Sequence, residues 1–144
     1  MVKKRPTITV GVLVMKENRV LLMRRRGPHG SGIWTTPVSP LEFWEQPEEA
    51  AIRAAFEEVG VRLADVHFRG LTNDIYETSG RHAVTIWMEA QHAAGEAIAN
   101  DEERVERVEW FEWTSLPKPI TAPLVNLLAG RCYPQQEIFP EGQD

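Results

Sequence analysis

Residues 37–61 read PVSPLEFWEQPEEAAIRAAFEEVGV, and this stretch decides the fold. It begins as a turn-rich loop and continues as a segment that carries glutamates in pairs. Pro47 suits the first position of a helix, and the two glutamates after it stabilise the positive end of the helix dipole. Gly60 is of the residue type that most often ends a helix. The pattern therefore predicts a helix from Pro47 to about Val59.

The apolar residues of this helix predict the face that it buries. They recur at helical spacing and are Ala51, Ile52, Ala55, Phe56 and Val59. Glu57 and Glu58 share another face with Ala54, because residues three and four apart lie on one side of a helix. Arg53 lies four residues before Glu57 and four after Glu49, so it can bridge the two. Taken alone, the paired acids are typical of a solvated helix surface.

The rest of the chain predicts strands and one further helix around this stretch. Alternating segments rich in Val and Ile predict strands at residues 7–15, 20–25, 65–68, 71–77, 82–91 and 106–113. Residues 121–129 predict a second helix, and the tail 133–144 is expected to be poorly ordered. These elements predict an α/β sandwich with a mixed sheet, built as a single domain of residues 1–144 with a core of about residues 7–129.

The composition limits the classes of function. The 144 residues suit one domain, and the formal net charge of −5 argues against a non-specific nucleic-acid binder, which needs a basic face. No segment approaches the roughly 18 apolar residues that cross a membrane. The single cysteine, Cys132, excludes an intrachain disulfide and favours a reducing, cytoplasmic location. An acidic protein can still bind a small phosphorylated substrate when metal ions mediate the contact.

The spacing of charged residues in 37–61 resembles the Nudix box of the Nudix (MutT-like) hydrolases. That pattern is Gly, five residues, Glu, seven residues, Arg-Glu, an aliphatic residue, any residue, Glu-Glu, any residue, Gly and an aliphatic residue. The matching residues here are Glu45, Arg53, Glu57, Glu58, Gly60 and Val61. The likeness covers about residues 7–129 and is greatest to the small nucleoside-triphosphate diphosphatases of the family. It implies the Nudix α/β/α sandwich.

The resemblance implies a metal-dependent hydrolase that cleaves a nucleoside diphosphate linked to another group. Glu57 and Glu58 match the family's ligands for Mg²⁺ or Mn²⁺, which would join an acidic protein to a polyanionic substrate. A later loop of the family often supplies another ligand. The acids of that loop here are Glu102 and Glu103, and Glu103 is the one that we assign.

The resemblance also implies roles for other residues. Arg53 matches the arginine that orients a glutamate of the box, and Glu45 matches the first glutamate of the box. Arg25 falls where related enzymes place a basic residue that contacts the substrate. The family also includes homodimers, so a homodimer is one expected state of this chain.

The chain departs from the family pattern around the expected pocket. Ala54 replaces the glutamate that follows the arginine, which removes a third carboxylate and is expected to weaken metal binding. Ser39 and Val38 replace the glycines that open the box, and Trp44 replaces the glycine before Glu45. Side chains at these positions change a loop that glycine would let turn sharply. We therefore expect the native activity to be impaired by Ala54 and by the altered loop 38–44.

These departures leave several functions open. The site could be a diverged or engineered pocket that binds or hydrolyses a non-nucleotide small molecule. Ser39 with His82 as a nucleophile–base pair, or a box glutamate as general base, would serve such a pocket, with Trp44 stacking on an aromatic ligand. A catalytically silent nucleotide-binding module is a second alternative. A protein–protein interaction domain, which the five tryptophans permit, is a third.

Overall fold

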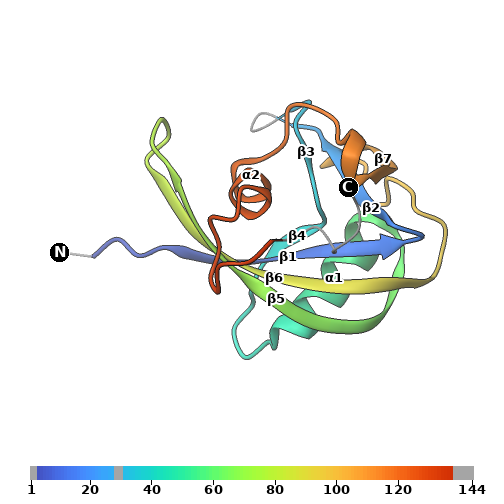
Figure 1. Cartoon of the computed structure of the whole chain (residues 1–144), viewed down its shortest axis with the longest axis horizontal. Coiled ribbons are helices and arrows are strands. Elements are labelled where there is room, and N and C mark those ends of the chain that lie inside the picture. Colours follow the sequence, from blue (N-terminus) through green and yellow to red (C-terminus); the bar gives the residue numbers. More distant parts are fainter. Residues whose placement is uncertain (1–2, 28–30, 138–144) are drawn as a thin grey trace.

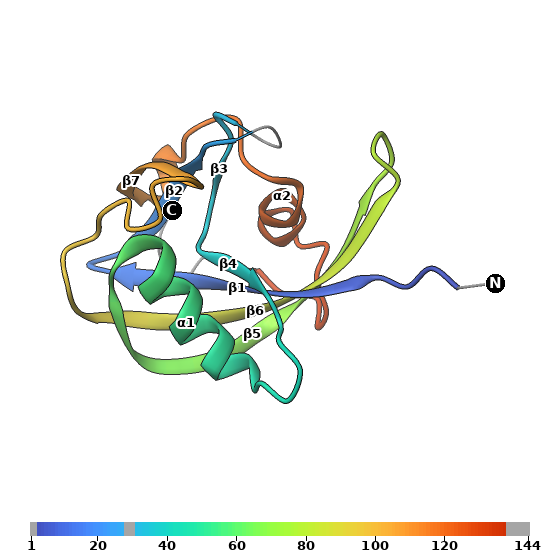
Figure 2. The same cartoon turned by 180° about the vertical axis from the view of Figure 1, so that it is seen from behind.

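The computed structural model describes residues 3–27 and 31–137 and shows a mixed β-sheet with a helix on each face (Figures 1 and 2). The helices are α1 (Pro47–Val59), α2 (Ala122–Leu128) and the short 3₁₀ helix η1 (Trp113–Ser115). The strands are β1 (Thr7–Lys16), β2 (Arg19–Arg25), β3 (Trp34–Thr35), β4 (Val38–Pro40), β5 (Arg62–Tyr76), β6 (Arg81–Ala94) and β7 (Val105–Glu112). The expected α/β sandwich is confirmed.

The sheet is mixed because β1 lies between partners of opposite direction. β1 pairs in parallel with β6 and antiparallel with β4, and it meets β2 only at the tight turn that joins them. β2 pairs along its length with β7, and β5 pairs with β6 to form the long outer hairpin (Figure 1). Among the described residues, no helix is long and apolar enough to cross a membrane.

Two apolar clusters fill the space between the sheet and its helices. Alternate residues of β1 point to opposite faces, so Val12 packs towards α1 while Leu13 packs towards α2. Gly11 lies against the indole of Trp87 on the α2 side, and a Cβ at this position would come within 2.9 Å of the ring. The close approach of β1 to this buried tryptophan therefore depends on a glycine.

Local signals set the bounds of α1 as predicted. The Glu49 side chain accepts a hydrogen bond from the Gln46 N–H at 3.0 Å, which satisfies a backbone donor before the first turn. Gly60 ends the helix in the left-handed conformation, with φ of 73°. The N–H groups of the loop that follows β6 then bind the last carbonyls of α1, including a bond from Asn100 to Glu58 O of 3.0 Å.

The predicted buried face of α1 is partly wrong. Ile52 and Phe56 are nearly half exposed, whereas Ala50 and Ala54 are buried. The reason lies outside the helix: β4 runs beside α1, so the helix turns a stripe of small residues towards that strand. Glu58 is on the same stripe and is therefore buried as well.

Three further expectations are revised by long-range pairing. The two strands predicted at 65–68 and 71–77 are one continuous strand, β5, because local shifts of register let it stay paired with β6. Residues 38–40 form a strand on β1. The tail expected from residue 133 is held at its start, because Tyr133 and Leu71 exchange two backbone hydrogen bonds of 2.8 Å. Residues 138–144 lie outside the described part of the chain.

The end of α1 generates a stability prediction. Gly60→Ala adds the strain of a left-handed L residue and places a Cβ 3.2 Å from Ile98 Cγ1. Gly80 has a similar φ of 72°, but a Cβ added there would have no atom within 4 Å, so Gly80→Ala is the matched control. We expect Gly60→Ala to lower the free energy of unfolding in urea by more than Gly80→Ala does. Equal losses of unfolding free energy in the two variants would show that the new contact with Ile98 costs nothing.

Candidate functional site

The guanidinium of Arg53 joins α1 to the loop that precedes it. Its Nε and Nη2 donate to the two carboxylate oxygens of Glu45 at 2.8 and 2.9 Å, a bidentate pair. Nη1 donates to Ser39 Oγ at 2.8 Å, and Nη2 also donates to Pro40 O at 3.1 Å. The carboxylates of Glu42 and Glu57 each lie 3.8 Å from Nη1. We call this group of contacts the Arg53 clamp.

The clamp fixes the charge of its own members. Glu45 is largely buried, with a side chain that is 12% exposed, and it also accepts a bond from the Glu42 N–H at 3.0 Å. The hydrogen bonds from Arg53 lower the pKa of Glu45 below its usual value, although burial acts in the opposite direction. Glu45 in turn raises the pKa of Arg53. Both groups are therefore held ionised, which makes the pair a fixed anchor of the loop.

Glu58 is the buried carboxyl group of the site. It is 8% exposed, and its Oε1 accepts a hydrogen bond from the Val38 N–H at 2.8 Å. Burial raises the pKa of Glu58 to about 7, and the Val38 N–H and the charges of Arg104 and Arg25 oppose this shift. The carboxyl group of Glu58 on α1 thus contacts the backbone of β4 at Val38, one of the residues that replace the glycines at the start of the box.

Glu57 faces solvent beside Arg53, and its side chain is 63% exposed. Asp101 lies near Glu58, because its N–H binds Glu58 O at 3.4 Å and its charge contributes to the raised pKa of Glu58. Glu103 as a further metal ligand stays a prediction. Within the described residues, no group of three or more His, Cys, Asp or Glu side chains could hold a metal ion. The sequence signal for Asp101 was only its place in an acidic loop.

Arg25 lies where the sequence placed it, at the end of β2 and near the site. Its positive charge lowers the pKa of both Glu58 and Tyr76, although burial raises the pKa of each by more.

Ser39 and His82 are not brought together. Ser39 Oγ accepts from Arg53, whereas His82 Nε2 bonds to Asn73 Oδ1 at 2.5 Å on the outer hairpin. A nucleophile–base pair of these two residues is therefore wrong.

Trp44 lies in solvent. Its side chain is 86% exposed, and its backbone adopts the left-handed conformation with φ of 70°. The loop has kept the turn that glycine allows in the family pattern and carries a large ring there instead. The expected stacking on an aromatic ligand stays a prediction.

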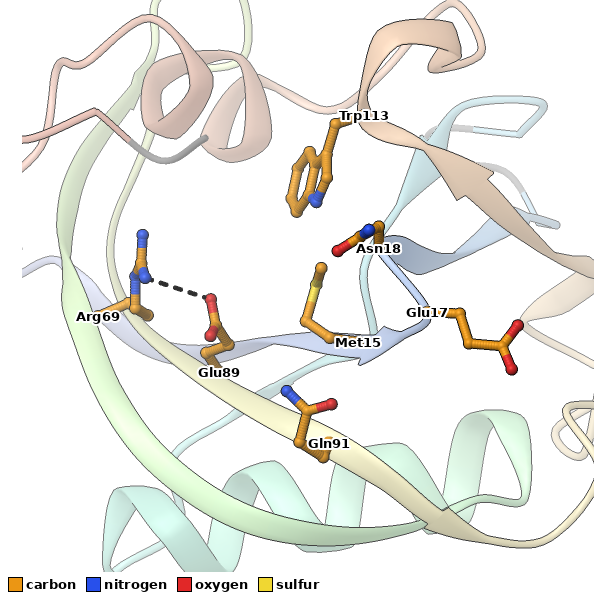
Figure 3. A pocket seen from close by; sticks show the side chains of 7 residues that line it. All are labelled: Met15, Glu17, Asn18, Arg69, Glu89, Gln91 and Trp113. Atoms are coloured by element: carbon orange, nitrogen blue, oxygen red, sulfur yellow. Dashed lines mark ion pairs between the residues drawn. The ribbon is translucent and has the colours of Figure 1, made fainter. Parts of the chain in front are cut away.

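A separate cavity of about 300 Å³ lies on the other face of the sheet. Figure 3 shows it on the side of β1 and β6 that faces α2, with α1 on the opposite side of these strands. Its lining residues are Met15, Glu17, Asn18, Arg69, Glu89, Gln91 and Trp113. Because neither glutamate of the Nudix-like pair lines it, this cavity is distinct from the site on α1.

The geometry of α1 and its loop agrees with the comparison to known families. The family model described as NUDIX domain matches residues 5–129. The chain belongs to the Nudix family. Its resemblance in the box is thus part of a likeness that spans most of the chain, and the Arg53 clamp, Glu57 and Glu58 occupy the Nudix helix.

Curated Nudix relatives differ in activity. The NAD-capped RNA hydrolase NudC of Pseudomonas aeruginosa is 29% identical over 137 residues, covering 90% of this chain and 46% of the relative. The ADP-ribose pyrophosphatase of Methanocaldococcus jannaschii is 26% identical over 113 residues, covering 78% of this chain and 66% of the relative. The 8-oxo-dGTP diphosphatase of Escherichia coli is 32% identical over 85 residues, covering 58% and 64%. The chain thus spans less than half the length of the NudC relative.

Comparison with a solved structure gives independent support for the fold. The crystal structure of a MutT NUDIX hydrolase from Burkholderia pseudomallei superimposes with a TM-score of 0.77 at 28% identity. The match covers 85% of this chain and 95% of that chain. The mixed sheet with its two helices is therefore the Nudix arrangement.

The clamp generates a prediction about stability. Arg53→Ala leaves Glu45 buried without its cation, so we expect a loss of about 2–3 kcal/mol of unfolding free energy at pH 7. The folded-state pKa of Glu45 is lowered, so its contribution is present above the unfolded value near 4.5 and is lost as pH falls below it. The difference in unfolding free energy between wild type and Arg53→Ala should therefore become smaller in acid. Arg19→Ala is the control, because it removes an exposed arginine at the start of β2. An equal loss of unfolding free energy in both variants would contradict the stabilising role of the clamp.

Glu58 generates a prediction of opposite sign. Its folded-state pKa of about 7 lies above the usual glutamate value of 4.5, so its burial is compatible with folding below pH 4.5 and destabilises the fold as pH rises towards 7. Glu58→Gln removes this dependence. The stability of Glu58→Gln relative to wild type should therefore rise by about 3 kcal/mol between pH 4.5 and 7 in urea unfolding without metal. A difference that does not change with pH would show that Glu58 is ionised in the folded state.

Proposed function

We propose that this chain is a divalent-metal-dependent hydrolase of a nucleoside diphosphate linked to another group, with impaired chemistry. The observation that carries the proposal is the pair Glu57 and Glu58 on the Nudix helix, with Arg53 fixed beside them. Nudix hydrolases generally use divalent metals such as Mg²⁺. Two of the relatives are named for nucleotides, ADP-ribose and 8-oxo-dGTP, which supports a nucleotide as the small-molecule substrate. The NudC relative is named for NAD-capped RNA, so the preference for a small substrate over a nucleic acid rests on the acidic charge of this chain.

The donor chemistry of the site fits Mg²⁺. This ion is held in many proteins by one or two carboxylates, with water and substrate phosphates completing its shell. Glu57 reaches solvent, and Glu58 Oε2 accepts no hydrogen bond from any residue that the structure describes. These two carboxylates would hold the ion, and Asp101, near Glu58, is a candidate further ligand beside the predicted Glu103. When bound, a divalent ion polarises phosphoryl oxygens and lowers the pKa of a coordinated water.

The chain's own residues supply binding and proton control. Arg25 and Arg104 bring positive charge to the Glu58 side of the site, where they can bind substrate phosphates. Glu57 is accessible to water and is the candidate general base of the pair. Glu58 holds a proton through much of the neutral range without metal, so metal binding must release that proton. Turnover should therefore rise with pH through the neutral range.

Ala54 is the basis for impaired chemistry. Its side chain is buried on the same stripe of α1 as Glu58, one helical turn earlier. A glutamate at this position would add a third carboxylate to the same face of α1. Its absence leaves two consecutive acids, one exposed and one buried, to share the metal.

Hydrolysis measurements test this proposal directly. We expect release of phosphate or of a nucleoside monophosphate from a panel of NAD⁺, ADP-ribose and nucleoside triphosphates with Mg²⁺ or Mn²⁺. We expect Ala54→Glu to raise kcat/KM at limiting Mg²⁺ by about tenfold, because a further carboxylate strengthens the metal site. Ala54→Gln has the same bulk without charge and serves as control. Activity in neither the wild type nor Ala54→Glu, at any metal concentration, would contradict the proposed function and favour a silent binding module.

A further inference from the structure

The cavity on the α2 side of the sheet lies where the apolar cluster of that side ends. α2 is seven residues long and α1 is thirteen, so α2 covers a shorter part of its face of the sheet. Along β1, Leu13 is fully buried in this cluster, whereas Met15 is only partly buried and lines the cavity. Trp113 is 7% exposed, and Figure 3 shows its ring directed towards Met15. Two apolar side chains thus form part of the cavity wall.

Two side-chain amides line the same cavity. Gln91 on β6 is the direct partner of Met15 in the parallel register of β1 and β6, and Asn18 comes from the turn between β1 and β2. Within residues 3–27 and 31–137, neither amide makes a side-chain hydrogen bond to another residue. Each amide therefore offers both its N–H donors and its carbonyl acceptor to a ligand.

The charged groups of the lining favour a neutral ligand. Arg69 Nη1 lies 3.3 Å from Glu89 Oε1, so the two charges largely neutralise each other. The other carboxylate oxygen of Glu89 faces His67 Nε2 at 3.5 Å. Glu17 also lines the cavity, and its side chain points away from the other lining residues in Figure 3. An anion would be repelled by both carboxylates, and a cation would have to compete with Arg69 for Glu89.

We propose that this cavity is a second binding site, separate from the acids of α1, for a neutral purine base carried by its nucleoside. A volume of about 300 Å³ is at the lower end for ligand pockets and suits one ring system. A purine has an apolar face for Trp113 and Met15, and its edge carries donor and acceptor atoms of the kind that Asn and Gln amides bind. Because Glu17 and Glu89 repel a phosphate, the nucleoside is favoured over its nucleotide. No metal and no diphosphate takes part, so this site is independent of the proposed hydrolysis.

Nuclear magnetic resonance of methionine methyl groups locates the bound nucleoside in the whole chain. In metal-free protein with ¹³C-methyl methionine, we expect adenosine and guanosine to shift the Met15 signal, which is assigned by its loss in Met15→Leu. Met23 and Met88 are buried in the cluster on the α1 side of the sheet, so their signals should stay in place. Shifts of Met23 or Met88 without Met15, or no shift with either nucleoside at millimolar concentration, would overturn the inference. Neither result would affect the proposed hydrolase.

Two cavity variants test the amides in the same titration. Gln91→Leu keeps similar bulk without the donor and acceptor, and Asn18→Gly removes the amide while it allows the left-handed φ of 65° at this turn. Each should weaken nucleoside binding about three- to tenfold, the effect of losing one hydrogen bond or two. Asn73→Ala removes an exposed amide on β5 that does not line the cavity, so it is the control. Unchanged Met23 and Met88 signals show that a variant is folded, and wild-type affinity in both folded cavity variants would overturn the inference.

Two further ligands separate recognition of the base from recognition of the sugar or phosphate. Ribose lacks the base and should leave the Met15 signal in place. Adenosine monophosphate has the same base with added negative charge, so it should bind roughly threefold more weakly than adenosine at low salt. A Met15 shift with ribose as large as that with adenosine would show that the cavity binds a sugar. That result, or equal affinity for adenosine and its monophosphate, would overturn the inference.

Discussion

The ionic hydrogen bonds of Arg53 are the contacts on which the site depends. A single guanidinium bonds to Glu45, Ser39 and Pro40 and so holds the loop before α1 against the helix. Charge-assisted bonds of this kind are about twice as strong as neutral ones, and the bidentate pair with Glu45 also fixes direction. The serine that stands where the family has glycine contributes its hydroxyl to the clamp. The altered loop is therefore bonded directly to the Nudix helix through one of its own replaced residues.

The clamp also explains how two adjacent acids acquire different roles. Fixing the loop against α1 brings β4 alongside the helix, and Glu58 then lies buried against the Val38 N–H while Glu57 remains in solvent. Burial raises the pKa of Glu58 to about 7, so this carboxyl group exchanges its proton in the neutral range. A cation bound there would compete with that proton. Metal binding at Glu58, as proposed, would therefore be linked to proton release.

The sequence predicted those parts of the structure that local chemistry determines. The bounds of α1 follow from Pro47 and Gly60, and the box spacing follows from residues that lie on one helix. The buried face of α1 was predicted less well, since β4 comes from elsewhere in the chain and selects Ala50 and Ala54 over Ile52.

The remaining misses have the same long-range cause. Asp101 approaches Glu58 only because the loop after β6 binds the carbonyl groups at the end of α1. Ser39 and His82 looked compatible in composition, but β1 separates their strands and each side chain has another partner. Pairing of distant segments cannot be read from spacing along one segment. The exposure of Trp44 likewise became evident only once the folded loop was known.

The central claim is that the clamped helix holds a divalent cation through Glu57 and Glu58. Titration with Mn²⁺ followed by electron paramagnetic resonance measures this without any substrate, because protein-bound Mn²⁺ loses the sharp signal of the free ion. We expect wild type to bind one Mn²⁺ more tightly at pH 8 than at pH 6, and Glu57→Gln and Glu58→Gln each to bind it at least tenfold more weakly. Equal binding by wild type and both variants, or no binding by wild type at pH 8, would contradict the account.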